Sequence, residues 1–162
     1  MKTTDSMHDD FNIEDDIKKD KNKQPISDCE ASFFIHYGYK ELLEENDKSN
    51  DELNMNPVFK EFLEYFKMFP NLRFGNNLEI EELSDALNER KSSLKNKREE
   101  LQNIEGLKES EIVLLINLKP ENINEAVTWI PSLKKKISQG KSKDINQALE
   151  IIKKYSTIEF SN

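Results

Sequence analysis

The stretch 114–133, LLINLKPENINEAVTWIPSL, constrains the fold most, because it holds two short apolar patterns separated by turn residues. Pro120 should end the first pattern, since proline has no N–H group and its ring clashes with the preceding helical turn. Helices this short are not stable alone in water, so their apolar faces must pack against each other. The stretch therefore predicts a compact helical docking module without a catalytic group.

The second pattern in this stretch has its own start and stop. Asn122 lies three residues before a glutamate, which is typical of a helix N-terminus. We expect this helix to place Ala126, Trp129 and Ile130 on one side, and Pro131 to end it. The residues after Leu133 are basic and polar, and we interpret them as a connection to a last helix over 143–154.

The composition narrows the class of protein. The 162 residues are 35% hydrophobic and 35% charged, with four glycines and five prolines, which favours helices over a β fold rich in tight turns. So lean a core predicts that part of the apolar surface needs a partner. The net charge of −8 argues against bulk attraction of nucleic acid, and no apolar run approaches the roughly 20 residues that span a membrane. One cysteine permits no internal disulfide and fits a reducing compartment.

A first helix is predicted over 27–45, because Ser27 and Glu30 have the spacing of a capping box. Its aromatic residues are so numerous that we expect burial on two sides, against its own core and against a partner. The predicted apolar stripe comprises Ala31, Phe34, Ile35 and Leu42, widened by Phe33 and Tyr37.

Asn56 followed by Pro57 predicts the start of a second helix, and Pro70 its end. This helix carries apolar residues on most sides, so we expect it to be central. Its main stripe, with spacing i, i+3, i+4 and i+7, is Phe59, Phe62, Leu63 and Phe66.

A long charged helix should follow, from about 78 to 103. Leucine or isoleucine recurs every seven residues from Ile80 to Leu101, but the second seam includes Arg90 and Lys97. Because a sustained two-stranded coiled coil wants both seams apolar, we expect one narrow seam against the chain's own domain or a partner. A self-associating coiled coil is the lesser alternative.

Residues 1–24 form a polar, acidic tail whose bulky apolar residues, besides methionine, are Phe11, Ile13 and Ile17. Too little can be buried to offset the entropy of ordering, so we predict disorder. As an alternative, Phe11 and Ile13 could add a short strand to the edge of a partner's sheet.

Three sequence blocks resemble one family, which comprises the stalk subunit numbered four of eukaryotic RNA polymerase II and its archaeal counterpart. LKPENINEAVTWIPSL, ISDCEASFFI and NPVFKEFLEYFKMFPNLRF all resemble blocks of that family, and they occur here in the family's order. The IPSL run at 130–133 is the most specific part, and it favours the polymerase II member over the polymerase III paralogue. The long charged helix and the acidic tail depart from the family pattern.

The resemblance implies an all-α chain in three parts: the tail 1–24, an N-terminal helical part 25–105, and a module 106–157 similar to the HRDC domain of RecQ-type helicases. It also implies a non-catalytic nuclear subunit without cofactors. Such a subunit pairs with the OB-fold-bearing stalk subunit seven, docks beside the polymerase clamp, acts in initiation and lies near exiting RNA. The alternatives are the polymerase III paralogue and a free-standing HRDC-type module that binds nucleic acid.

Partner or core contacts are expected from the apolar residues of these blocks, although the sequence does not separate the two roles. They are Ile26, Ala31, Phe33, Phe34, Ile35, Tyr37, Phe59, Phe62, Leu63, Phe66, Ile130 and Leu133. Weak auxiliary contact with RNA is an alternative for basic residues in two clusters. They are Lys95, Lys97, Arg98, Lys134, Lys135 and Lys136.

We find no credible active site in the sequence. Gly140-Lys141-Ser142 resembles the end of a phosphate-binding loop, but the glycine required five residues earlier is absent. Cys29 and His36 share a helical face without the further ligands that a metal site needs, so we expect them to be packing residues.

Overall fold

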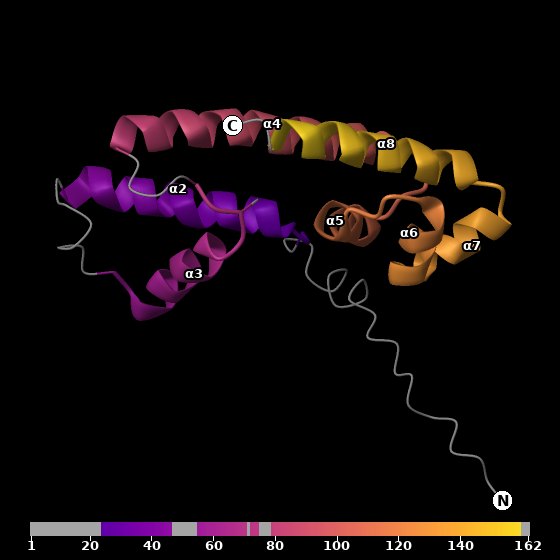
Figure 1. Cartoon of the computed structure of the whole chain (residues 1–162), viewed down its shortest axis with the longest axis horizontal. Coiled ribbons are helices and arrows are strands. Elements are labelled where there is room, and N and C mark those ends of the chain that lie inside the picture. Colours follow the sequence, from indigo (N-terminus) through magenta and orange to yellow (C-terminus); the bar gives the residue numbers. More distant parts are fainter. Residues whose placement is uncertain (1–23, 47–54, 71, 75–78, 160–162) are drawn as a thin grey trace, which may run out of the picture.

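The computed structural model describes residues 24–46, 55–70, 72–74 and 79–159, and within them the chain is all-α, as predicted (Figure 1). The helices are α2 (Asp28–Asn46), α3 (Pro57–Lys67), α4 (Ile80–Gln102), α5 (Glu109–Leu118), α6 (Ile123–Trp129), α7 (Ser132–Ser138) and α8 (Ser142–Glu159). The predicted tail and its strand-forming residues Phe11 and Ile13 lie outside the described residues. None of the described helices is long and apolar enough to cross a membrane.

Helix α4 is the longest described element, and it contacts helices from both halves of the chain (Figure 1). The N-terminal half comprises α2, α3 and most of α4, and the C-terminal half comprises the end of α4 and α5 to α8. Helix α2 packs along α4, and α3 packs on α2, whereas α8 lies along α4 and covers α5, α6 and α7. Of the predicted seam, Leu87, Leu94 and Leu101 pack within the chain itself, whereas Ile80 is exposed.

Two separate hydrophobic clusters form the core. The first is Cys29, Phe33, Leu43, Phe66, Leu72, Phe74, Leu83, Leu87 and Leu94. The second is Leu101, Ile104, Ile112, Leu115, Ile116, Ala126, Ile130, Leu133, Ile145, Ala148, Leu149 and Ile152. Helix α4 therefore contributes Leu83, Leu87 and Leu94 to the first cluster and Leu101, in its last turn, to the second.

The predicted helix starts are present as hydrogen bonds. The Ser27 N–H donates to Glu30 Oε2 at 2.7 Å, and the Glu30 N–H donates to Ser27 Oγ at 3.3 Å, which completes the capping box. Asn56 and Asn122 accept hydrogen bonds from backbone N–H groups two and three residues later, at 2.9 and 3.0 Å. These caps satisfy N–H groups that have no partner inside the helix.

The apolar stripe predicted for α2 is confirmed only in part, because Ala31 and Ile35 pack against the first cluster but the centre of the buried face lies elsewhere. Its buried face includes the polar Ser32 and His36, while Phe34 is exposed. Burial of these polar groups is tolerated because each is hydrogen-bonded: Ser32 Oγ donates to the Leu72 carbonyl, and His36 Nδ1 lies 2.8 Å from the Ser32 carbonyl. Cys29 and His36 are both buried packing residues, as predicted.

The central position predicted for α3 is also wrong. Helix α3 contacts α2, with Phe66 in the cluster that contains the buried residues of α2, and it leaves Phe62 exposed. The reason is that α4 already supplies the leucines that pack against α2, so α3 lies outside this pair.

The connection predicted after Leu133 is instead helix α7. Pro131 takes the N-cap position, and the completely buried Leu133 anchors the helix in the second cluster. Proline fits here because it is tolerated at the start of a helix, where its missing N–H would have no intrahelical partner. Trp129, expected to be buried with Ala126 and Ile130, is exposed.

We predict that Gly38→Ala stabilises the chain by about 0.5–1 kcal/mol, because glycine inside a helix is unfavourable relative to alanine. The added Cβ would meet the Phe59 ring at 3.6 Å, an ordinary contact distance. Urea unfolding measures the change. Gly106→Ala is the matched control and should destabilise, because Gly106 has a φ of +87°. Destabilisation by Gly38→Ala would show that α2 and α3 pack more closely than described.

A second prediction concerns pH. Burial lowers the pKa of His36 against the opposing effect of its bond to the Ser32 carbonyl, so folding favours the neutral ring. The unfolded chain takes up a proton near the ordinary pKa of about 6.5, so the free energy of unfolding should fall as the pH drops below that value. We expect a smaller fall for His36→Gln between about pH 7.5 and pH 5.5, measured by urea unfolding. Equal slopes for the two proteins would contradict a depressed pKa.

Candidate partner-binding surface

Helices α2 and α3 carry large apolar side chains that the chain does not bury. On α2, Phe34 is 59% exposed. On α3, Val58 is 59%, Phe62 48% and Tyr65 52% exposed. Large apolar side chains that gather on two adjacent helices typically mark an interaction site.

The exposed side chains of α3 share one helical face. Val58, Phe62 and Tyr65 are spaced i, i+4 and i+7 along α3, and Phe69 follows just after the helix ends, whereas Leu63 and Phe66 of α3 are buried. The Tyr65 and Phe69 ring centres lie 5.0 Å apart, so the aromatic rings pack on each other at the surface. Helix α3 therefore has a second apolar face that points away from the core. We call Val58, Phe62, Tyr65 and Phe69, together with Phe34 and Tyr37 of α2, the α2–α3 surface.

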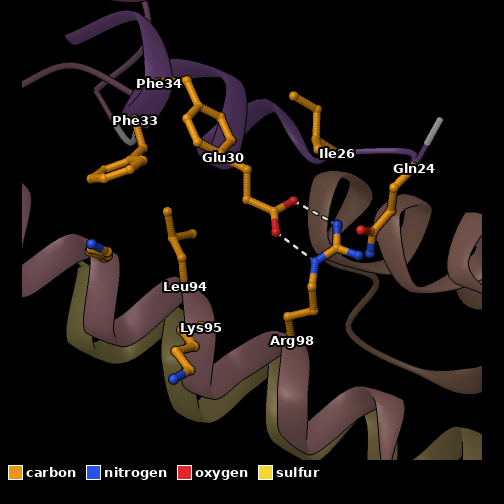
Figure 2. A pocket seen from close by; sticks show the side chains of 9 residues that line it. Gln24, Ile26, Glu30, Phe33, Phe34, Leu94, Lys95 and Arg98 are labelled. Atoms are coloured by element: carbon orange, nitrogen blue, oxygen red, sulfur yellow. Dashed lines mark hydrogen bonds and ion pairs between the residues drawn. The ribbon is translucent and has the colours of Figure 1, made fainter. Parts of the chain in front are cut away.

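A groove of about 290 Å³ lies between α2 and α4 (Figure 2). Its apolar lining comes from Ile26, Phe33 and Phe34 on one side and Leu94 on the other. The remaining lining residues are Gln24, Glu30, Lys91, Lys95 and Arg98. The groove thus combines an apolar floor with a mostly basic rim along α4.

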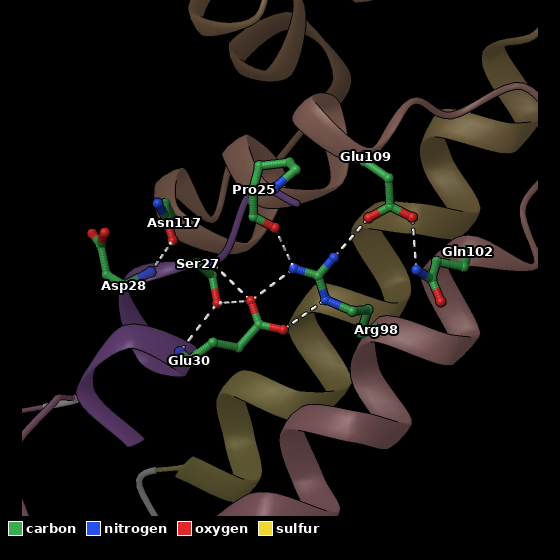
Figure 3. Close-up of polar contacts among 8 residues, drawn as sticks. All are labelled: Pro25, Ser27, Asp28, Glu30, Arg98, Gln102, Glu109 and Asn117. Carbon is green, nitrogen blue, oxygen red and sulfur yellow. Dashed lines mark hydrogen bonds and ion pairs between the residues drawn. The ribbon is translucent and has the colours of Figure 1, made fainter. Parts of the chain in front are cut away.

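Arg98 closes one end of the groove through a bidentate ion pair (Figure 3). Its Nε donates to Glu30 Oε1 at 2.6 Å, and one terminal nitrogen donates to Glu30 Oε2 at 2.8 Å and to the Pro25 carbonyl at 2.9 Å. The other terminal nitrogen donates to Glu109 Oε2 at 2.6 Å. One guanidinium group on α4 therefore holds α2, the residues before α2, and α5.

Two further hydrogen bonds extend this network. Gln102 Nε2 donates to Glu109 Oε1 at 2.6 Å, and the Asp28 N–H donates to Asn117 Oδ1 at 3.0 Å (Figure 3). The second bond joins the start of α2 directly to α5. The network thus fixes the two halves of the chain to each other where the two hydrophobic clusters meet.

The charges of the central pair are stabilised by the same contacts. Burial on its own raises the pKa of Glu30, but the hydrogen bonds from Arg98 and Ser27 outweigh it and hold the pKa below its usual value. The hydrogen bond to Glu30, opposed by partial burial, raises the pKa of Arg98. Both groups are therefore ionised at neutral pH, as a paired and partly buried ion pair requires.

The structure separates the expected apolar contacts into two groups. Phe33, Leu63, Phe66, Ile130 and Leu133 are buried in the core. Ala31, Ile35 and Phe59 are half-buried, and Ile26, Phe34, Tyr37 and Phe62 are exposed. Only the exposed group, and in part the half-buried one, is available to a partner.

The basic residues considered for RNA do not form one surface. Lys97 is 2% exposed, with its ammonium group 5.8 Å from the Tyr155 ring centre. Arg98 is engaged by carboxylates, and Lys136 pairs with buried Glu111 at 3.0 Å. Lys95, Lys134 and Lys135 are exposed, but they lie on α4 and α7 rather than in one cluster. The structure thus places half of the six away from the solvent-facing surface.

Sequence reasoning missed the roles of Val58 and Tyr65, which lie outside the main stripe predicted for this helix. The spacing of these residues with Phe62 was the available signal. It also missed the Arg98 network, because the capping-box position of Glu30 gave no indication of a distant partner. Within the described parts of the chain, no three His, Cys, Asp or Glu side chains are grouped so that they could hold a metal ion.

Replacing Arg98 tests the network. Arg98→Met keeps much of the volume but leaves Glu30 without its charge partner, and we expect the free energy of unfolding to fall by about 2 kcal/mol. Lys67→Ala, which removes the exposed pair with Glu64, is the control and should leave stability close to that of the unmodified chain. Urea unfolding of the purified chains measures both. Equal losses for the two variants would show that the network does not hold the halves together.

Comparison with known proteins gives the family. The chain matches the family described as RNA polymerase Rpb4 over residues 13–156, which is most of its length. It is also 29% identical over 126 residues to DNA-directed RNA polymerase II subunit 4 of Arabidopsis thaliana, covering 77% of this chain and 74% of that protein. No solved structure matches significantly. The chain belongs to the RNA polymerase Rpb4 family, whose members are non-catalytic polymerase subunits.

Proposed function

We propose that this protein is a subunit of DNA-directed RNA polymerase II that forms a stalk heterodimer with the OB-fold-bearing subunit seven. In this proposal the heterodimer docks beside the clamp, acts in transcription initiation and lies near exiting RNA, in the nucleus. The family membership and the named plant relative support the assignment to polymerase II. The IPSL run at 130–133 supports it over the polymerase III paralogue.

The α2–α3 surface is the observation that carries the proposed pairing. Six large apolar side chains of this surface are exposed: Phe34, Tyr37, Val58, Phe62, Tyr65 and Phe69. A free-standing protein would expose such side chains to water permanently, which favours association. Aromatic residues of this kind are also the ones that typically dominate the free energy of an interface. A constitutive partner that covers them accounts for their presence on a chain with so small a core.

The free-standing nucleic-acid-binding module is less well supported. It requires a basic surface, whereas Lys97, Arg98 and Lys136 are engaged within the chain. Exposed Lys134 and Lys135 leave weak, salt-dependent RNA contact as an auxiliary property of α7.

Single substitutions in the α2–α3 surface test the pairing. Phe34→Asp and Phe62→Asp replace exposed apolar side chains with charge, so they should abolish co-elution with subunit seven without unfolding the chain. Loss of a hot-spot aromatic typically costs about 2 kcal/mol or more of binding free energy, or at least about 30-fold in affinity. Co-expression followed by size-exclusion chromatography measures the complex, and circular dichroism checks that each variant is folded.

Trp129→Asp is the matched control, because Trp129 is an exposed aromatic residue on α6, outside the α2–α3 surface. It should leave co-elution intact. If the unmodified chain behaves as a monomer and shows no complex with subunit seven, the stalk assignment is rejected. If Trp129→Asp breaks the complex while Phe34→Asp and Phe62→Asp do not, the partner binds another face.

A further inference from the structure

The side chains that line the groove between α2 and α4 indicate which kind of group can bind there. Phe33 and Leu94 face each other across it, and Phe34 lies beside Phe33, with the ring centres of the two phenylalanines 5.5 Å apart (Figure 2). Its volume, about 290 Å³, is at the lower end of small-molecule pockets and suits one bulky side chain. The aromatic lining favours an aromatic occupant, because ring pairs gain energy beyond the area that they bury.

The basic residues at the rim of the groove favour a negatively charged binding partner. Lys91 and Lys95 line the groove from α4, one helical turn apart. Lys95 has one distant and exposed ion pair, to Glu99 at 3.7 Å, which holds it only weakly. The Glu30 carboxylate in the groove is already neutralised by Arg98. An occupant with acidic residues next to its aromatic side chain therefore complements this rim.

A segment of the same chain has this composition. Residues 9–17, DDFNIEDDI, carry five acidic residues, three bulky apolar ones and no basic residue. They precede the described part of the chain, which begins at Gln24, and Gln24 itself lines the groove. The seven residue-to-residue steps from Ile17 to Gln24 can span up to about 25 Å, more than the roughly 10 Å from Lys91 to Arg98 along α4. The segment is thus tethered at the groove with enough length to turn back into it.

We propose that residues 9–17 bind in this groove, with the Phe11 ring against Phe33 and Leu94 and the acidic residues beside Lys91 and Lys95. The contact is intramolecular, so the short tether supplies a high effective concentration and a weak interaction suffices. Because Phe34 also belongs to the α2–α3 surface, the bound segment shields part of that surface. The binding of the segment does not depend on the pairing with subunit seven, and its test uses the full chain alone.

A spin label on the segment tests the contact. Cys29 is buried, so Asn12→Cys allows a nitroxide to be attached next to Phe11 in the full chain. We expect paramagnetic broadening of the backbone amide signals to be strongest near Phe34, Leu94 and Lys95, and absent from α7. Uniform broadening, or broadening centred on another surface, overturns the proposal.

Charge reversal gives the matched variants. Lys91→Glu combined with Lys95→Glu should remove the selective broadening, whereas Lys134→Glu combined with Lys135→Glu, the same charge change on α7, should leave it unchanged. Adding Asp15→Lys and Asp16→Lys to the first variant should restore it. Unchanged broadening in the Lys91 and Lys95 variant contradicts the proposal.

A mixed sample separates the chain's own segment from that of a second copy. Isotope-labelled chains without the nitroxide are combined with unlabelled chains that carry it. Broadening in the labelled chains would mean that the groove binds the segment of another molecule, which overturns the intramolecular contact.

Discussion

The Arg98 guanidinium is the interaction on which the arrangement of the two halves depends. It projects from α4 and is bound by Glu30 at the start of α2 and by Glu109 at the start of α5. Each partner belongs to a different half of the chain, and each lies in the first turn of its helix, where a carboxylate is also favoured by the helix dipole. Removing the guanidinium would leave two carboxylates near each other without a cation, which is why its loss should cost more than the loss of a surface pair.

Sharing α4 between two small clusters explains why apolar surface is left over. Leu83, Leu87 and Leu94 pack with α2, while Leu101 packs with the C-terminal helices. Since α4 occupies the inner side of α2, α3 can contact α2 from one side only. The outer face of α3 then has no other part of the described chain to cover it, and its aromatic residues remain exposed. The apolar α2–α3 surface is thus a consequence of the way the chain is built, and it is suited to a polymerase subunit that works in contact with other subunits.

Local signals predicted more of this fold than tertiary signals did. The caps at Ser27, Asn56 and Asn122 depend on residues within three positions, and all three were predicted correctly. The face of α2 was not, because its run of aromatic residues is compatible with several registers, and the buried Ser32 and His36 acquire their partners only from the folded chain. Helix α7 was missed because three consecutive lysines separate its two anchoring residues, Leu133 and Ile137, and so short an apolar pattern was not apparent.

The candidate site shows the same division. An apolar excess on the first two predicted helices was apparent from composition and spacing, whereas its assignment to Phe34 rather than Phe33 required the structure. Likewise, Lys97 and Lys136 occur in charged stretches of the sequence that are typical of a protein surface. In the structure, Lys97 lies against the ring of Tyr155 and Lys136 pairs with Glu111, and both partners are distant in the sequence. Which polar residues are engaged is decided by long-range packing, which one sequence does not display.

The covering of the α2–α3 surface in the assembled state can be measured by oxidative footprinting. Phe62 and Tyr65 of this surface are exposed in the chain and react with hydroxyl radicals when solvent reaches them. Their rates of modification are compared between the isolated chain and the same chain purified with its polymerase partners. We expect a marked fall in both rates upon assembly, because a partner that covers this surface excludes solvent from both side chains. Equal rates in the two samples would contradict a covered α2–α3 surface.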